Sequence, residues 1–130
     1  MTANHTSSRA ALSNEAFAEA FFDNMRSRGI FQDDGEQHRL EDIAYWANVF
    51  AEARPTEVSR IYLENHAQNL HGEERGGWSD VDCVEFLRRC GCQITTVTEQ
   101  GCKRAWTYWA FTIPGSDSAP RRLFLKKVVP

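Results

Sequence analysis

The sequence predicts an α+β fold, in which a helical N-terminal part with three to four helices packs on a small C-terminal three-stranded antiparallel sheet. Two observations predict it. Apolar residues recur every three or four positions between Ser13 and Cys90, which is the spacing of amphipathic helices. Beyond Gly91, β-branched and aromatic residues take over, as in strands. A chain of 130 residues suits one core, so we expect a single domain over residues 13–130 after a flexible tail at 1–12.

The first predicted helix begins at Ser13. Phe17, Phe21 and Met25 stand four residues apart and form one apolar face, and Gly29 ends the run.

A turn at residues 32–35 leads into a second predicted helix, which ends before Pro55. Its apolar stripe consists of Leu40, Ile43, Ala44, Ala47 and Phe50. Thr56 suits the N-cap of a third helix that continues to Leu70.

The fourth predicted helix carries the best local signature in the chain. Ser79 followed by Asp82 fits a capping box, with Asp in place of the usual Glu or Gln. Trp78 before the cap suits packing on Cys83 as a hydrophobic staple. Gly91 stands where a left-handed residue ends such a helix.

Three strands are predicted next: residues 92–98, residues 105–113 after a turn at Gly101, and residues 121–129 returning antiparallel. Alternation along the second strand puts three side chains on each face: Trp106, Tyr108 and Ala110 on one, and Trp109, Phe111 and Ile113 on the other. Both faces are apolar, which predicts either a strand covered on both sides or an exposed aromatic patch.

The order of elements over residues 79–113 is helix, glycine, strand, turn, strand. This order resembles the helix-plus-wing half of a winged-helix module. The resemblance implies a DNA-binding transcriptional regulator that uses the basic C-terminal part.

The net charge of −3 conceals an asymmetry. Residues 1–82 carry 15 acidic and 7 basic side chains, a net −8, and residues 83–130 carry 3 acidic and 8 basic side chains, a net +5. Such a chain can present one acidic and one basic surface to different partners. The alternative is that the two parts attract each other across one fold.

The four cysteines stand at 83, 90, 92 and 102. We expect a cytoplasmic protein, because the N-terminus lacks the pattern of a secretory signal and no run of eighteen apolar residues suits a membrane span. Thiols then stay reduced. Zinc held by Cys90, Cys92, Cys102 and His71 is an alternative, but structural zinc pairs usually have C-x₂₋₄-C spacing. We expect cysteines that belong to the core, no metal site and no cofactor.

Catalytic motifs are missing from the sequence. No G-x-S-x-G elbow occurs, and Gly76-Gly77 precedes Trp78 without the lysine of a phosphate-binding loop. The sequence therefore predicts no enzyme and no catalytic residue.

Nucleic-acid binding is one surviving function. Basic residues interleave with the aromatic residues of the second strand, a combination that suits backbone phosphates and stacked bases. The candidates for this contact are Lys103, Arg104, Arg121, Arg122, Lys126 and Lys127. Against groove recognition, the fourth helix begins with Asp80 and Asp82, which repel phosphates. Such basic residues also occur on sheet edges merely to discourage aggregation.

The preferred hypothesis is a small non-enzymatic binding protein that inhibits or modulates a macromolecular partner by protein–protein contact. In size and lack of enzyme motifs the chain resembles inhibitors encoded by phages and mobile elements, such as anti-defence (anti-CRISPR-type) inhibitors and immunity proteins. The partner is expected to be a protein, which can itself belong to a nucleic-acid-binding complex. The candidate partner-binding residues are Trp106, Trp109, Arg121, Arg122, Asp33, Asp34 and Glu36. The oligomeric state is left open.

Overall fold

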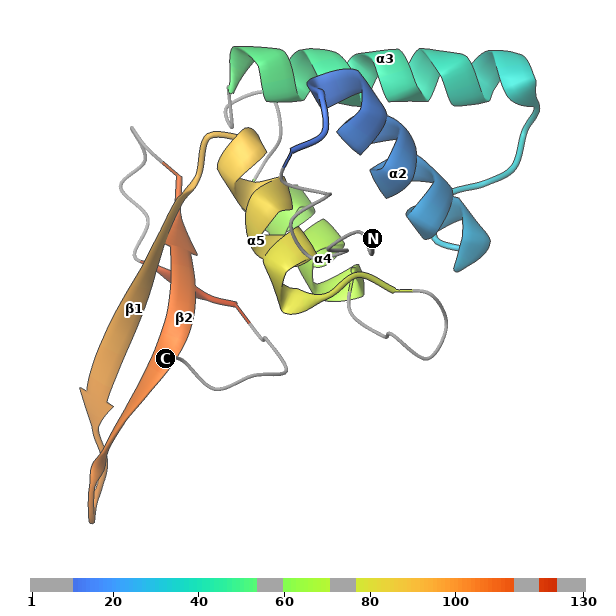
Figure 1. Ribbon diagram of the computed structural model, residues 1–130. Coiled ribbons are helices and arrows are strands. Elements are labelled where there is room, and N and C mark those ends of the chain that lie inside the picture. The colour runs from blue at the N-terminus through green and yellow to red at the C-terminus, as the bar shows by residue number, and fades with distance from the viewer. Residues whose placement is uncertain (1–10, 54–59, 71–76, 114–119, 124–130) are drawn as a thin grey trace, which may run out of the picture.

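The computed structural model describes residues 11–53, 60–70, 77–113 and 120–123. In this part of the chain four helices precede a three-stranded antiparallel sheet, which confirms the predicted α+β fold (Figure 1). The elements are α2 (Asn14–Ser27), α3 (Glu36–Glu52), α4 (Arg60–Asn69), α5 (Asp80–Arg89), β1 (Gln93–Gln100), β2 (Ala105–Thr112) and β3 (Arg121–Arg122). None of the described helices combines the length and the apolar character that crossing a bilayer requires.

Helix α2 forms as its sequence predicts. The Ser13 hydroxyl accepts a hydrogen bond from the Ala16 N–H at 3.1 Å, which satisfies one of the free donors of the first turn. Phe17, Phe21 and Met25 are fully buried along one face. The spacing of the apolar residues and the cap therefore determine both the start of α2 and the face that it buries.

An ion-pair network joins α3 to α2. The Arg39 guanidinium bonds the carboxylates of Glu19 at 2.6 Å, Asp23 at 2.8 Å and Glu36 at 3.0 Å. Its hydrogen bonds lower the pKa of Asp23 below the ordinary value. One side chain thus links two carboxylates of α2 to the first turn of α3.

The apolar stripe predicted for α3 is only partly buried. Ala47 and Phe50 lie in the core, but Leu40 is 52% exposed and Ala44 is also exposed. The side chains that α3 buries beside them are Trp46 and Val49, which the predicted stripe omits. The prediction was wrong about Leu40 and Ala44. Helical spacing places them on one apolar face, but the rest of the core packs against an adjacent side of α3, which carries Trp46 and Val49.

The predicted capping box of α5 is confirmed. The Ser79 hydroxyl accepts from the Asp82 N–H at 3.3 Å, and the Asp82 carboxylate accepts from the Ser79 N–H at 3.4 Å. Trp78 and Cys83, predicted as a staple, are both buried in the same core cluster. Gly91 follows the helix with φ +89°, a conformation that a residue with a Cβ rarely adopts.

The third predicted helix and third strand are described in part. Helix α4 covers Arg60–Asn69, and the predicted N-cap at Thr56 lies outside the described residues. Strand β3 covers Arg121–Arg122 and pairs antiparallel with β2 as predicted, while residues 124–129 of the predicted strand lie outside the described part.

Aromatic rings from all four helices meet in the core. The Phe21 ring of α2 stacks on Phe86 of α5 with centroids 4.8 Å apart and meets Trp46 of α3 edge-on at 4.9 Å. The His66 ring of α4 lies 5.8 Å from Phe21. The sheet closes this core from one side with the fully buried Phe111 of β2.

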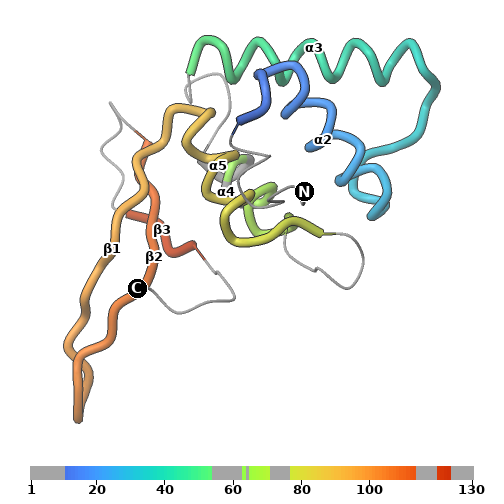
Figure 2. The backbone as a smooth tube through the Cα atoms, viewed as in Figure 1, coloured from blue at the N-terminus to red at the C-terminus, as the bar shows by residue number. Residues whose placement is uncertain are grey.

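The hairpin of β1 and β2 extends beyond the core. The sheet order is β1-β2-β3, and the short β3 pairs only with Ala110 and Phe111 of β2. The far half of the hairpin projects away from the helices (Figures 1 and 2). Its structure therefore depends on the two strands themselves.

The end of α3 allows a test of backbone strain. Ala53 has φ +50°, the left-handed conformation that glycine adopts without a Cβ clash. We expect Ala53→Gly to raise the free energy of unfolding by about 1 kcal/mol and Ala51→Gly, two residues earlier and inside the helix, to lower it by a similar amount. Urea denaturation of both variants measures the two signs. Destabilisation by both substitutions would contradict the left-handed end.

The buried His66 makes the stability depend on pH. Burial lowers the pKa of His66 to about 4, from an ordinary value of 6.5. The unfolded chain therefore binds a proton at this residue below pH 6.5, whereas the folded protein does not until the pH approaches 4. We expect this residue to reduce the free energy of unfolding by up to about 3 kcal/mol as the pH falls through that window. Denaturation of wild type and His66→Phe between pH 7 and 4.5 measures it, and parallel curves for the two proteins would refute it.

Candidate interaction surface on the hairpin

The exposure of the β2 side chains increases from the base of the hairpin to its turn, in addition to any difference between the two faces of the sheet. At the base of β2, Ala110 and Phe111 are fully buried although they point to opposite faces. Nearer the turn, Trp106 and Thr107 are both exposed. The two predictions made for this strand therefore each apply to one half: the base is covered on both sides, and the far half carries an exposed aromatic residue.

Trp109 lies on the side of the sheet that faces the core. This ring is partly buried and packs against the core together with Ile94, and Phe111 follows on the same face. Trp109, a predicted partner-binding residue, thus contributes mainly to packing. Of the two candidate tryptophans, Trp106 is the exposed one, with 49% of its surface accessible.

The opposite side of the sheet carries a row of side chains that we call the outer face. The strand register places Glu99 beside Trp106, Val97 beside Tyr108 and Ala110 beside Arg122. The outer face consists of Val97, Glu99, Trp106, Tyr108 and Arg122. The Arg122 guanidinium lies over the Tyr108 ring, 4.9 Å from its centroid, a cation–π contact that joins β3 to β2.

The Trp106 ring is positioned by the turn. A Cβ placed on Gly101 would lie 2.6 Å from the ring and 2.7 Å from the Arg104 carbonyl oxygen, so the indole lies directly on the glycine backbone. The Gly101 N–H also donates to the Arg104 carbonyl at 2.9 Å, which closes the turn. An exposed indole held in this way loses little conformational freedom when a partner covers it.

The basic candidates fall into two groups. Lys103 and Arg104 are exposed in the turn, whereas Arg121 and Arg122 are exposed beside the base of β2. Five or six residues of strand separate the groups, on the order of 15 to 20 Å. Lys126 and Lys127 lie outside the described residues.

The N-terminal turn of helix α5 is acidic, which is unfavourable for contact with the phosphates of a nucleic acid. The order predicted for residues 79–113 is observed: helix, glycine, strand, turn, strand. The first turn of α5, however, carries Asp80 and the buried Asp82 of the capping box. Near its other end, Arg89 is bound to Glu85 at 2.6 Å and to the Leu12 carbonyl at 2.7 Å. Arg88 is the exposed arginine of α5.

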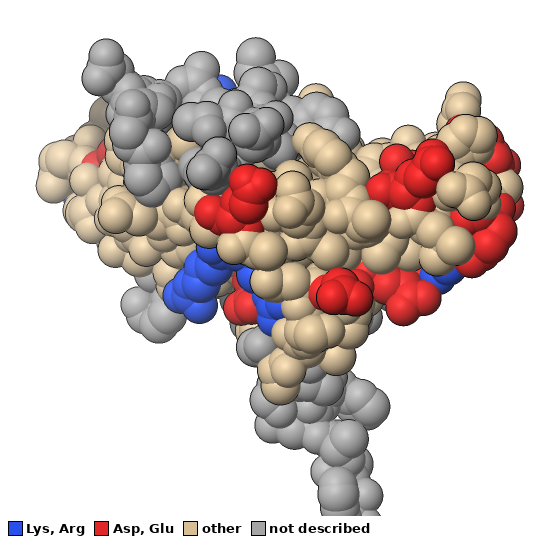
Figure 3. Space-filling model, turned by 90° about the horizontal axis from the view of Figure 1, so that it is seen from above, with Lys and Arg blue, Asp and Glu red and all other residues tan. Residues whose placement is uncertain are grey.

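The acidic candidates lie far from the hairpin. Asp33, Asp34 and Glu36 are exposed where the chain passes from α2 to α3, and acidic side chains gather at that end of the molecule (Figure 3). Asp33 lies 3.6 Å from Arg26, and Glu36 pairs with Arg39. The partner-binding residues predicted from the sequence therefore form two separate surfaces.

The cysteines are not brought together. Cys90 and Cys92 are buried at the base of the hairpin, whereas Cys102 is exposed in the turn beyond the eight residues of β1. The length of that strand, roughly 26 Å, exceeds the span of any zinc site. Among the described residues no three His, Cys, Asp or Glu side chains form a metal-binding group.

Comparison with protein-family models, with curated proteins and with solved structures gave no match. The surface therefore has to be interpreted from its own geometry. Sequence reasoning did not single out Val97 or Gly101 for this surface. Their roles depend on the pairing of β1 with β2, and the Gln100-Gly101 turn signal is the one local pattern that could have indicated it.

The different burial of the thiols predicts selective labelling. Burial raises the pKa of Cys92 to about 12 and raises those of Cys83 and Cys90 as well. We expect a maleimide at neutral pH to modify the folded protein at one of its four cysteines, Cys102, and to modify all four in denaturant. Mass spectrometry counts the adducts. Rapid labelling of a Cys102→Ser variant under native conditions would show that the buried cysteines have been misplaced.

Proposed function

We propose that this chain is a small non-enzymatic binding protein that inhibits or modulates a macromolecular partner through the outer face of its hairpin. The supporting observation is the half-exposed Trp106, held on Gly101 near the end of a projecting hairpin. Inhibitors and immunity proteins of phages and mobile elements act in this general way, by covering a surface of their target.

The composition of the outer face favours a protein partner. Trp, Tyr and Arg are the residues that dominate binding energy at protein interfaces, and here Trp106, Tyr108 and Arg122 share one face. Glu99 stands directly beside Trp106. A carboxylate next to the exposed indole disfavours a phosphate backbone and suits a donor group of a protein.

Nucleic acid is the second candidate, favoured by Lys103 and Arg104 in the turn next to Trp106. In that case the hairpin would act as a wing, with the indole stacking on a base. Retention on DNA that falls steeply with salt would support this candidate. The acidic first turn of α5 weighs against it.

Substitutions on the hairpin test the proposal. We expect Trp106→Ala to weaken capture of the specific partner from a lysate of the source cells by at least about tenfold, because an anchoring aromatic residue contributes 2 kcal/mol or more, by rough estimate. Gly101→Ala should act in the same direction by displacing the ring. Tyr45→Ala is the matched control, because Tyr45 is 48% exposed on α3 at a different surface.

Thermal melting shows whether each variant remains folded, and DNA retention is measured in parallel over a salt series. Equal capture by wild type, Trp106→Ala and Arg122→Glu would exclude the outer face as the binding surface. DNA binding that depends on salt, is lost in Lys103→Glu and is kept in Arg88→Glu would show that the partner is a nucleic acid and not a protein.

A further inference from the structure

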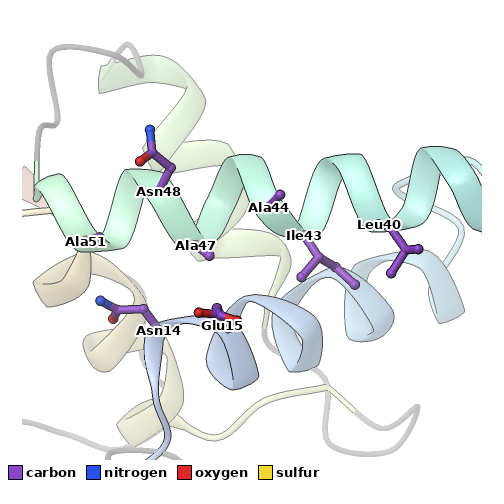
Figure 4. Close-up of a pocket in the computed structure, with 8 residues that line it drawn as sticks. All are labelled: Asn14, Glu15, Leu40, Ile43, Ala44, Ala47, Asn48 and Ala51. Atoms are coloured by element: carbon purple, nitrogen blue, oxygen red, sulfur yellow. The ribbon is translucent and has the colours of Figure 1, made fainter.

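We infer a second binding surface, a groove between α2 and α3 that accepts a basic amphipathic helix of a protein partner. It is separate from the hairpin and does not depend on the function proposed for it. The groove has a volume of about 640 Å³ and is lined by Asn14, Glu15, Leu40, Ile43, Ala44, Ala47, Asn48 and Ala51. Figure 4 shows Leu40 and Ile43 reaching from α3 towards α2, whose first turn carries Asn14 and Glu15.

The apolar part of the groove comes from α3 and is partly open to solvent, and the polar residues Asn14, Glu15 and Asn48 border it. Leu40 is 52% exposed, and Ala44 and Ala51 are exposed as well. Leu40 and Ala44 belong to the apolar stripe predicted for this helix, and the described helices leave these two residues exposed. An amphipathic helix covers such a surface by placing residues at i, i+4 and i+7 into it.

The dimensions of the groove suit a helix. From Leu40 to Ala51 the lining extends along three turns of α3, about 16 Å at the helical rise. The middle of this stretch is formed by Ala44 and Ala47, whose short side chains allow a second helix to approach closely. A bulky Leu40 at one end limits how far that helix can slide along the groove.

The charges around the groove specify a basic partner. Helices α2 and α3 together contain seven carboxylates and two arginines, a net −5. Both arginines are engaged: Arg39 pairs with Glu19, Asp23 and Glu36, and Arg26 lies 3.6 Å from Asp23 and from Asp33. Exposed carboxylates remain on both helices: Glu15 lines the groove on α2, and Glu41 and Asp42 are exposed on α3 between the lining residues Leu40 and Ile43. Lysine and arginine on the polar side of the bound helix would complement them.

Binding of designed peptides to the whole chain tests this inference. The probe is a fluorescent peptide of about 15 residues, long enough to span the groove, with leucines at helical spacing and lysines elsewhere. A scrambled peptide of the same composition and a version with glutamate in place of lysine are the controls. We expect fluorescence anisotropy to show binding of the amphipathic basic peptide at least about tenfold tighter than either control, weakening in about 0.5 M salt.

Variants locate the binding site of the peptide. Ala44→Arg fills the groove and adds a repelling charge, so we expect it to weaken binding at least about tenfold. Val81→Arg is the control, because Val81 is 47% exposed on α5 and outside the groove. Glu15→Gln should weaken binding by a smaller factor, and Trp106→Ala should leave it unchanged. Melting curves confirm folding of each variant.

Three outcomes would overturn the inference. The first is equal binding of the amphipathic and scrambled peptides, which would mean attraction by charge without use of the groove. The second is an unchanged affinity in Ala44→Arg. The third is no binding of the basic peptide to the wild-type protein.

Discussion

The arrangement of the helices depends on the contacts that the Phe21 ring makes in the core. This ring stacks on Phe86 of α5 and meets Trp46 of α3 and His66 of α4, so each of the other three helices places a ring against it. Each such aromatic contact contributes about 1 kcal/mol beyond the burial of its area, and loss of the whole ring from a core costs about 3 to 5 kcal/mol. Because these contacts come from segments far apart in the chain, they determine how the helices are arranged.

The geometry of this core explains why the far half of the hairpin is exposed. The helices present one apolar side to the sheet, and Phe111 with its neighbours at the base of β2 is enough to cover it. The strands then continue past the last helix contact, held by their own pairing and by the turn at Gly101. An isolated two-stranded hairpin is only marginally stable in water, and the base anchored in the core compensates for that. A rigid base and an exposed end are together suited to presenting Trp106.

The charge asymmetry of the sequence becomes a separation in space. Acidic residues gather on α2 and α3 (Figure 3), whereas Lys103 and Arg104 lie in the hairpin turn and Arg121 and Arg122 form β3. Arg39 serves the internal stability of the acidic region by joining α2 to α3. The groove between α2 and α3 therefore lies in an acidic region, whereas the outer face of the hairpin carries one carboxylate, Glu99, and one guanidinium, Arg122.

Local features of this protein could be predicted from the sequence because they depend on residues close together in the chain. The start of the first helix near Ser13, the box of Ser79 with Asp82, the left-handed Gly91 and the α+β order are of this kind. The sequence could not predict that Trp106 rather than Trp109 is the exposed tryptophan, or that α3 is uncovered at Leu40. Those outcomes depend on which elements pack on which faces, and periodicity specifies only that a face is apolar. The sequence by itself thus determined the elements and their charges, and only the tertiary structure decided which apolar faces remain available for binding.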